Sequence, residues 1–307
     1  MKKFGIGSRV SRTEDLRFLT GKGQYVDDIA PPSAAHMLFL RSIIAHGKIT
    51  HLDIKSALLS PGVIKIYTGK TINGKLINSI DFQTVKTKNG NSGASPVRPI
   101  IAEKKVNFVG EIIAAVIAKT REQALDAIEL IDLEFEELSA HVETKPGGPE
   151  IHKEAPNNIA FEWSFGDEAK VKSKFALAEH HIKMDLIDNR VIANPIETRG
   201  CFAEKTQNRI HFCFNGQGVW NAKNELIRKL KLKKNSLRVT NPDVGGGFGM
   251  KAFTYPEYFL VAMACNDLNL TVKWISDRSE GIISDNGGRD LTTKAEAAFS
   301  KQYELLA

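Results

Sequence analysis

The sequence predicts a mixed α+β protein made of two parts. Runs of apolar and β-branched residues that fit strands alternate along the 307 residues with stretches whose apolar residues recur every three or four positions. A break at 145–149, KPGGP, is followed by polar residues to Asn158 and is typical of a linker, with the boundary between about Val142 and Ile159. The length allows two ordinary domains, each with a buried core.

The first part is expected to begin with a polar, glycine-rich arm over residues 1–28 that lies on something larger. The patterns that follow predict three strands, at 36–42, 49–54 and 63–67, with a short helix at 56–59 and a long exposed loop over 71–99. An apolar run at 107–118, a helix at 120–130 and a strand at 131–135 then form a strand, helix, strand unit. Thr120 fits the N-cap of that helix, with Gln123 three residues on.

The second part is predicted to alternate strands and helices again. Helical spacing occurs at 169–178 and 220–232, and strand patterns occur at 181–186, 201–204, 209–214 and 270–275. Asp277 to Glu280 is predicted as a charged turn, and a further alternating run begins at Leu291.

Composition excludes several classes of protein. The chain is 42% hydrophobic and 25% charged, as in globular proteins, and its net charge of +6 is modest. The lysine run from Lys229 to Lys234 ends a predicted helix, where a solvated face is expected rather than a nucleic-acid site. Three distant cysteines fit reduced thiols, and no stretch fits a signal peptide or membrane span, so a soluble cytoplasmic protein is expected.

One glycine-rich stretch, VTNPDVGGGFGMK at 239–251, is the best candidate for a binding site. It follows a strand pattern and precedes a helical one, so its backbone N–H groups and the start of a helix could bind an anionic phosphate or oxo group. Lys251 is followed by Ala252 rather than a hydroxyl residue, which excludes a Walker A loop, and the glycine spacing does not fit a dinucleotide-binding motif. A glycine cluster after a strand also fits a tight turn, which stays open as the alternative.

Several separated segments resemble one protein family. They are GSRVSRTEDLRFLTGKGQYVDD, FVGEIIAAVIAKTREQALDAIELIDLEFEEL, NPIETRGCFAE, GQGVW, VGGGFGMK and SDRSEGIISDNGGRD. Together they resemble the N-terminal part of the molybdenum-binding large subunit of the xanthine dehydrogenase and aldehyde oxidase family. The likeness is nearest to its bacterial carbon monoxide dehydrogenase-like large subunits.

This resemblance implies an α/β hammerhead domain with its arm over 1–145, a linker over 146–158 and the first, incomplete part of a molybdopterin-binding domain over 159–307. It implies molybdopterin as cofactor, as the molybdopterin cytosine dinucleotide, with iron–sulfur clusters and FAD on partner subunits. The implied partners are the C-terminal remainder of the large subunit, an iron–sulfur small subunit and an FAD-binding medium subunit.

The resemblance also assigns cofactor-binding residues. Gly246, Gly247, Phe248 and Gly249 match the loop that lies against the molybdenum centre, and Gln217 matches a glutamine beside the metal, where its amide can donate to an oxo group. No protein ligand to the metal is expected, because the pterin dithiolene holds it. Without the resemblance, Gln217 would be interpreted as a polar turn residue between two glycines.

Other polar residues of the matching segments are expected to maintain the fold. Glu197 fits a structural role near the site better than a catalytic one, and Glu111 and Arg289 fit backbone bonding or an ion pair. His180 and His181 begin a strand and are expected at the surface rather than on a metal.

Two departures from the family bear on function. Xanthine-specific members have a substrate-facing glutamate where this chain has Ala252, which argues against such a purine substrate. The family's general base is a glutamate in a far C-terminal motif beyond Ala307, so no catalytic residue is expected here. We therefore expect part of an oxidoreductase for an aldehyde, N-heterocycle or similar small molecule, inactive alone, or alternatively a non-catalytic remnant or assembly module that binds other subunits.

Overall fold

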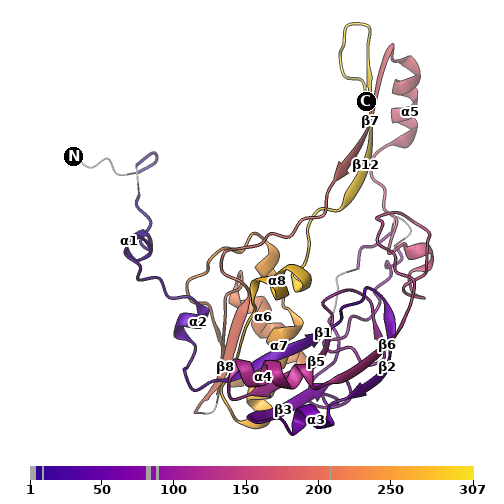
Figure 1. Ribbon diagram of the computed structural model, residues 1–307. Helices are drawn as coiled ribbons and strands as arrows, with labels where there is room; N and C mark the ends of the chain where they lie inside the picture. Colours follow the sequence, from indigo (N-terminus) through magenta and orange to yellow (C-terminus); the bar gives the residue numbers. More distant parts are fainter. Residues whose placement is uncertain (1–4, 9, 81–83, 88–89, 208) are drawn as a thin grey trace.

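The body of the molecule is built around one mixed seven-stranded sheet (Figure 1). The structure, a computed structural model, describes residues 5–8, 10–80, 84–87, 90–207 and 209–307. In order across the sheet, the strands are β10 (Leu237–Thr240), β9 (Arg209–Phe214), β8 (Gly200–Thr206), β11 (Val272–Ile275), β1 (Ala35–Arg41), β5 (Ile112–Ala118) and β3 (Val63–Thr68). Strands from both predicted parts therefore share one sheet, joined where β1 pairs in parallel with β11 at Ala35 and Val272.

A smaller three-stranded sheet belongs to the first part alone. It consists of β4 (Lys105–Val106), β2 (Gly47–Asp53) and β6 (Asp132–Glu137). The helices α3 (Lys55–Leu58) and α4 (Arg121–Glu129) pack on the seven-stranded sheet, α3 against β3 and α4 against β1, β3 and β5. Thr120 caps α4 as predicted, and its hydroxyl accepts the N–H of Gln123 at 3.3 Å. The predicted strand, helix, strand unit is present, but β5 and β6 lie in different sheets. The strand β5 pairs with β1 and β3 and is buried throughout, whereas β6 pairs with β2 and is partly exposed.

The core of the second part surrounds α7 (Pro256–Leu268). Ten of its residues, from Pro256 to Cys265, are buried, as expected for a helix that is apolar on all sides. Its Tyr258 ring lies 5.2 Å from Phe214 and 6.4 Å from Trp274, centroid to centroid. The helix α6 (Val219–Lys229) falls within the predicted helical stretch 220–232 apart from its first residue and contacts α7, and Leu226 and Leu230 are buried in the core.

Three local predictions were wrong. The glycine stretch does not run directly into a helix, because Met250–Ala252 form a 3-10 turn, η3, and α7 begins only at Pro256, where a proline fits the first helical turn. The predicted charged turn is the start of α8 (Arg278–Ser284), whose N-cap Asp277 accepts the Glu280 N–H at 2.7 Å.

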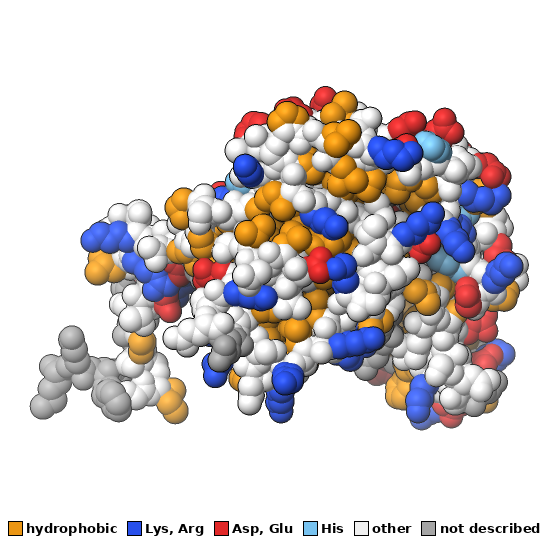
Figure 2. Space-filling view, turned by 90° about the horizontal axis from the view of Figure 1, so that it is seen from below, with side chains coloured by type: hydrophobic (Ala, Val, Ile, Leu, Met, Phe, Trp, Pro, Cys, Tyr) orange, Lys and Arg blue, Asp and Glu red, His pale blue; other side chains and the backbone are white. Residues whose placement is uncertain are grey.

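The lysine run is not wholly solvated either. Lys229 is buried, and its Nζ donates to the hydroxyl of Ser79 at 2.9 Å. Figure 2 shows other lysine and arginine side chains scattered among acidic and apolar ones on one face of the molecule. Two further 3-10 turns, η1 (Pro156–Asn158) and η2 (Lys234–Ser236), lie in connecting segments.

Two extensions leave the body (Figure 1). One is the N-terminal arm with α1 (Asp15–Leu19), which joins the body near α2 (Val26–Ile29). The other is a ribbon of β7 (His180–Asp188) and β12 (Leu291–Phe299), with α5 (Glu168–Leu177) beside it. In the predicted loop at 71–99 and in the arm, residues 81–83, 88–89, 1–4 and 9 lie outside the described residues.

The cysteines are as predicted. Cys201, Cys213 and Cys265 are all free and buried, and burial raises the pKa of each thiol. Within the described residues, no helix has both the length and the apolar character needed to cross a membrane.

Candidate functional site

The glycine loop between β10 and η3 has the backbone shape that its sequence requires. Gly246 and Gly249 have φ of 102° and 82°, in the left-handed region that favours glycine. Phe248 is also left-handed, with φ of 51°, and its side chain is 74% exposed. Among the described residues, none accepts a hydrogen bond from the N–H groups of Gly246, Gly247, Phe248 or Gly249. These donors are available to a ligand.

Glu197 fixes the entrance of this loop. Its Oε2 accepts the N–H of Gly245 at 2.7 Å and the ammonium of Lys251 at 3.1 Å. A Cβ on Gly245 would lie 2.4 Å from the Cβ of Glu197, so only glycine fits there. Burial lowers the pKa of Lys251, and Glu197 acts in the opposite direction. The predicted structural role of Glu197 agrees with this geometry.

Gln217 lies against the glycine loop although thirty residues of sequence separate them. Its N–H donates to the carbonyl of Lys251 at 3.0 Å, and a Cβ on Gly247 would lie 2.6 Å from the side-chain Cδ of Gln217. Gln217 is exposed, and nothing lies within 4 Å of a Cβ built on Gly249. An exposed amide and four free backbone donors on an open surface can bind an electron-rich oxygen group.

The remaining predicted residues lie elsewhere. Glu111 is buried and accepts the N–H of Asn107 at 2.7 Å, and Arg289 lies 3.8 Å from the carboxylate of Asp188. The His180 ring stacks on Tyr303 at 4.6 Å between centroids. No cluster of three His, Cys, Asp or Glu side chains within the described ranges could hold a metal ion. Of these residues only Glu111 is buried, whereas the Arg289 ion pair lies at the surface, and Ala252 is exposed beyond the loop.

A buried ionic network behind the loop was missed by the sequence reasoning. Arg199 is fully buried and donates to both oxygens of Glu257, at 2.9 and 3.3 Å, and also to Asp285. Arg41, from the first part, donates to Glu257 and to Glu280, both at 2.7 Å. Arg41 from the first part of the chain and Arg199 from the second part thus both pair with the carboxylate of Glu257.

The arginines of this network stabilise the charged form of Glu257. Burial by itself would raise the pKa of Glu257, but Arg199 and Arg41 lower it to about 2. The Arg199 guanidinium also lies 3.8 Å from the centre of the Tyr255 ring. The sequence does contain one signal for this network, which is Glu257 at the start of the apolar helix PEYFLVAMAC. A charge in a buried helix requires a partner of opposite charge.

Comparison with known families gives two matches that together cover most of the chain. Residues 20–139 match the family described as aldehyde oxidase and xanthine dehydrogenase, a/b hammerhead domain. Residues 151–307, about half of the chain, match the family described as molybdopterin cofactor-binding domain.

Individual relatives agree with these matches. The nicotine 6-hydroxylase large subunit of Paenarthrobacter nicotinovorans is 37% identical over 286 residues, which cover 91% of this chain and 34% of that protein. The carbon monoxide dehydrogenase large chain of Hydrogenophaga pseudoflava is 30% identical over 98% of this chain and 39% of its own length. The chain thus spans between a third and two fifths of the length of these relatives.

Solved structures show the same architecture. Quinoline 2-oxidoreductase from Pseudomonas putida 86 superposes with a TM-score of 0.84 at 30% identity, over 97% of this chain and 38% of that one. A reconstituted CO dehydrogenase from Oligotropha carboxidovorans gives a TM-score of 0.86 at 29% identity, again over 38% of the solved chain.

Proposed function

Because the chain belongs to the molybdopterin cofactor-binding domain family and has the aldehyde oxidase and xanthine dehydrogenase hammerhead segment before it, we propose that its glycine loop and Gln217 form one wall of the molybdopterin site of a molybdenum hydroxylase-type oxidoreductase. The observation that carries this proposal is the contact of Gln217 with Gly247, beside backbone N–H groups that have no partner among the described residues.

The residues present fit an oxygen-rich cofactor. The N–H groups of Gly246 to Gly249 and the amide of Gln217 are donors, and such donors bind oxo and phosphate oxygens without adding charge. The ammonium of Lys251 is buried and pairs with Glu197, so this cation stabilises the loop and does not face a ligand. When bound, the cofactor supplies a metal centre that can accept electrons from the substrate.

The substrate class we propose is an aldehyde, an N-heterocycle or a similar small molecule that is oxidatively hydroxylated. Ala252 beyond the loop carries no carboxylate, which argues against a purine held by a glutamate at that position. We propose the cytosine dinucleotide form of the cofactor, with iron–sulfur clusters and FAD on partner subunits. In this proposal, residues 1–145 form the hammerhead domain with its arm, 146–158 the linker and 159–307 part of the cofactor domain.

The ribbon of β7 and β12 supports the proposal that further polypeptide completes the site. Ile182, Met184 and Leu186 alternate along β7, and each is at least 45% exposed, so one face of the ribbon is apolar. A two-stranded ribbon is marginally stable alone and gains from a covered face. We propose the C-terminal remainder of a large subunit as the partner there.

The second candidate function is a non-catalytic assembly module, and the same exposed ribbon favours it. Molybdenum and pterin analysis separates the two functions, with the chain purified alone and co-expressed with the C-terminal part of a relative's large subunit and its two smaller subunits. Cofactor that co-purifies on co-expression supports the enzyme subunit. An assembled complex that contains no molybdenum in this chain's site would support the module instead.

A further inference from the structure

The N-terminal arm contacts the entrance of the glycine loop through Asp243, which lies two residues before Gly245. Asp243 donates its N–H to the Gln24 carbonyl at 3.0 Å, and its carboxylate accepts the Gln24 N–H at 2.9 Å. The guanidinium of Arg17, on α1, donates to both oxygens of the same carboxylate, with Nε 3.1 Å from Oδ2. Asp243 therefore joins the loop to two separate points of the arm.

Glu197 makes a second contact with the arm. Its Oε1 accepts the N–H of Val26 at 3.4 Å, while its Oε2 pairs with Gly245 and Lys251. Val26 is only 1% exposed and packs against β8 in a small apolar cluster, so this end of the arm is anchored to the body. Two nearby N–H groups of the arm, at residues 24 and 26, thus donate to the two carboxylates at the loop entrance.

The pair of Arg17 and Asp243 joins a half-exposed side chain to an almost buried one. The Asp243 side chain is 10% exposed, and that of Arg17 is 46% exposed. Hydrogen bonds from Arg17 and from the Gln24 N–H lower the pKa of Asp243, so the carboxylate stays charged. A guanidinium that donates to both oxygens of a carboxylate fixes orientation as well as distance. This pair can therefore hold the loop entrance in one position.

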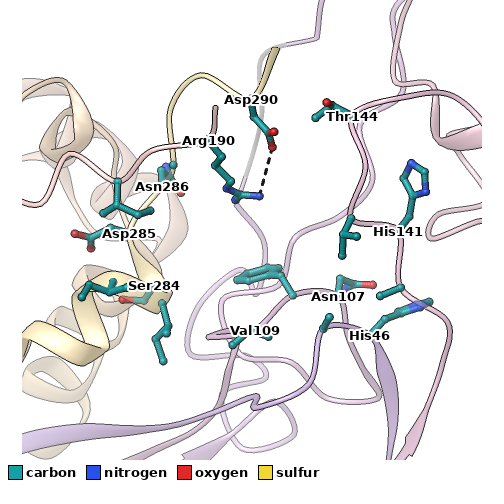
Figure 3. Close-up of a pocket in the computed structure, with 18 of the residues that line it drawn as sticks. His46, Asn107, Val109, His141, Thr144, Arg190, Ser284, Asp285, Asn286 and Asp290 are labelled. Atoms are coloured by element: carbon teal, nitrogen blue, oxygen red, sulfur yellow. Dashed lines mark ion pairs between the residues drawn. The ribbon is translucent and has the colours of Figure 1, made fainter. Parts of the chain in front are cut away.

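The exit of the loop has a different support. Tyr255 is buried, and its hydroxyl donates to the Met250 carbonyl at 3.0 Å and accepts the Asn286 N–H at 3.1 Å. Asn286 follows Asp285 on one wall of a cavity at the seam between the two parts of the chain (Figure 3). Asp285 is itself paired with Arg199 of the buried ionic network. The core thus holds the exit of the loop, whereas the arm holds the entrance.

The helix α1 has little else to keep it beside the body. It has no buried residue, and its Leu16 and Leu19 are 74% and 85% exposed. Apolar burial therefore does not hold α1 in place, and the pair of Arg17 with Asp243 joins it to the loop.

We propose that the arm is a positioning element of the glycine loop, with Arg17 and Asp243 as the positioning residues that hold the loop entrance and keep the unpaired loop N–H groups available. The inference rests on the proposed function only for its consequence, which is that a loop without this contact captures the molybdenum cofactor poorly. A loop that is already ordered binds a ligand more tightly, because less conformational entropy is lost on binding.

Amide hydrogen exchange of the full 307-residue chain tests the positioning role. The N–H of Gly245 and the N–H of Lys251, which donates to the Gly247 carbonyl at 3.2 Å, report the folded loop without bonding to the arm. We expect Asp243→Asn to speed exchange at both amides about tenfold, because it removes the charge that binds Arg17. Amides of α7, in the core, should stay within about twofold of the parent chain.

Two substitutions serve as controls. Asp27→Asn makes the same change at a carboxylate that pairs the arm with Lys273 of β11, at 3.3 Å, rather than with the loop. Arg12→Ala removes a neighbouring arginine whose carboxylate partners belong to the arm itself. Both controls should leave loop exchange within about twofold of the parent chain, whereas Arg17→Ala should match Asp243→Asn.

Unchanged exchange at Gly245 and Lys251 in the folded Asp243→Asn chain would overturn the proposal. Equal acceleration throughout the chain, α7 included, would also overturn it, because the pair would then support the fold in general. In the assembled protein, Asp243→Asn should contain about tenfold less molybdenum than Asp27→Asn, and equal contents would contradict the consequence. If the parent protein binds no molybdenum, the cofactor proposal fails, and the exchange result still decides the role of the arm.

Discussion

Glu197 and Gly245 exchange two hydrogen bonds across the base of the glycine loop. The loop N–H donates to the carboxylate at 2.7 Å, and the Glu197 N–H donates to the Gly245 carbonyl at 3.2 Å. The same carboxylate neutralises the fully buried Lys251. One acidic residue thus sets both the shape and the charge of the loop.

We expect Glu197→Ala to destabilise the protein by about 3 kcal/mol, because it leaves a buried ammonium and a loop N–H unpaired. Urea unfolding measures this change. Arg289→Ala removes an exposed ion pair and serves as the control, with an expected change below about 1 kcal/mol. Similar losses in the two variants would contradict the role of Glu197.

Gly247→Ala should lower the molybdenum content of the assembled protein roughly tenfold. The added Cβ would lie 2.6 Å from Gln217 Cδ and push the amide away from the loop. Gly288→Ala is a matched control, because nothing lies within 4 Å of its Cβ. Metal analysis by mass spectrometry decides the matter, and full occupancy in Gly247→Ala would count against the site.

Acid should weaken the fold through Glu257. Its pKa is lowered to about 2 in the folded protein, so its stabilising effect is present above the unfolded value and is lost as pH falls from about 4.5 toward 2. The integrated effect is roughly 3 kcal/mol. Unfolding free energies measured between pH 6 and 3 should fall steeply in the parent chain and less steeply in Glu257→Gln, which is less stable at neutral pH.

Glu111 should act with the opposite sign. Burial raises its folded pKa to about 7, so its contribution is greatest below about pH 4.5 and is lost as pH rises through 7. In Glu111→Gln this decline should vanish, which urea midpoints at pH 5 and pH 8 would show. Glu136→Gln, on an exposed strand of the first part, is the control. A decline that persists in Glu111→Gln assigns it to another group.

Local patterns predicted most elements but not how they pair. The N-cap Thr120 and the strand Arg209–Phe214 were predicted correctly, because helix capping and strand alternation depend only on residues that are close in the sequence. The pairing of β1 with β11 joins residues more than two hundred positions apart, and no local pattern contains it.

The site was predicted unevenly for the same reason. The contact of Gln217 with the glycine loop was expected only from the family resemblance. Arg199, Arg41 and Glu257 were missed because each looks like a surface charge until the fold buries it. The 3-10 turn between the glycine stretch and α7 was not predicted, because the apolar residue Phe253 comes before Pro256, where the helix begins.

The parallel neighbour of β1 is synthesised long after β1 itself. During translation, one edge of the strand at residues 35–41 has no partner until residue 272 has left the ribosome. An early ribosomal product ending at the glycine-rich connection near residue 147 would carry an open sheet edge, which invites pairing with other nascent chains. Chaperone demand should therefore peak midway through synthesis and drop once β11 emerges.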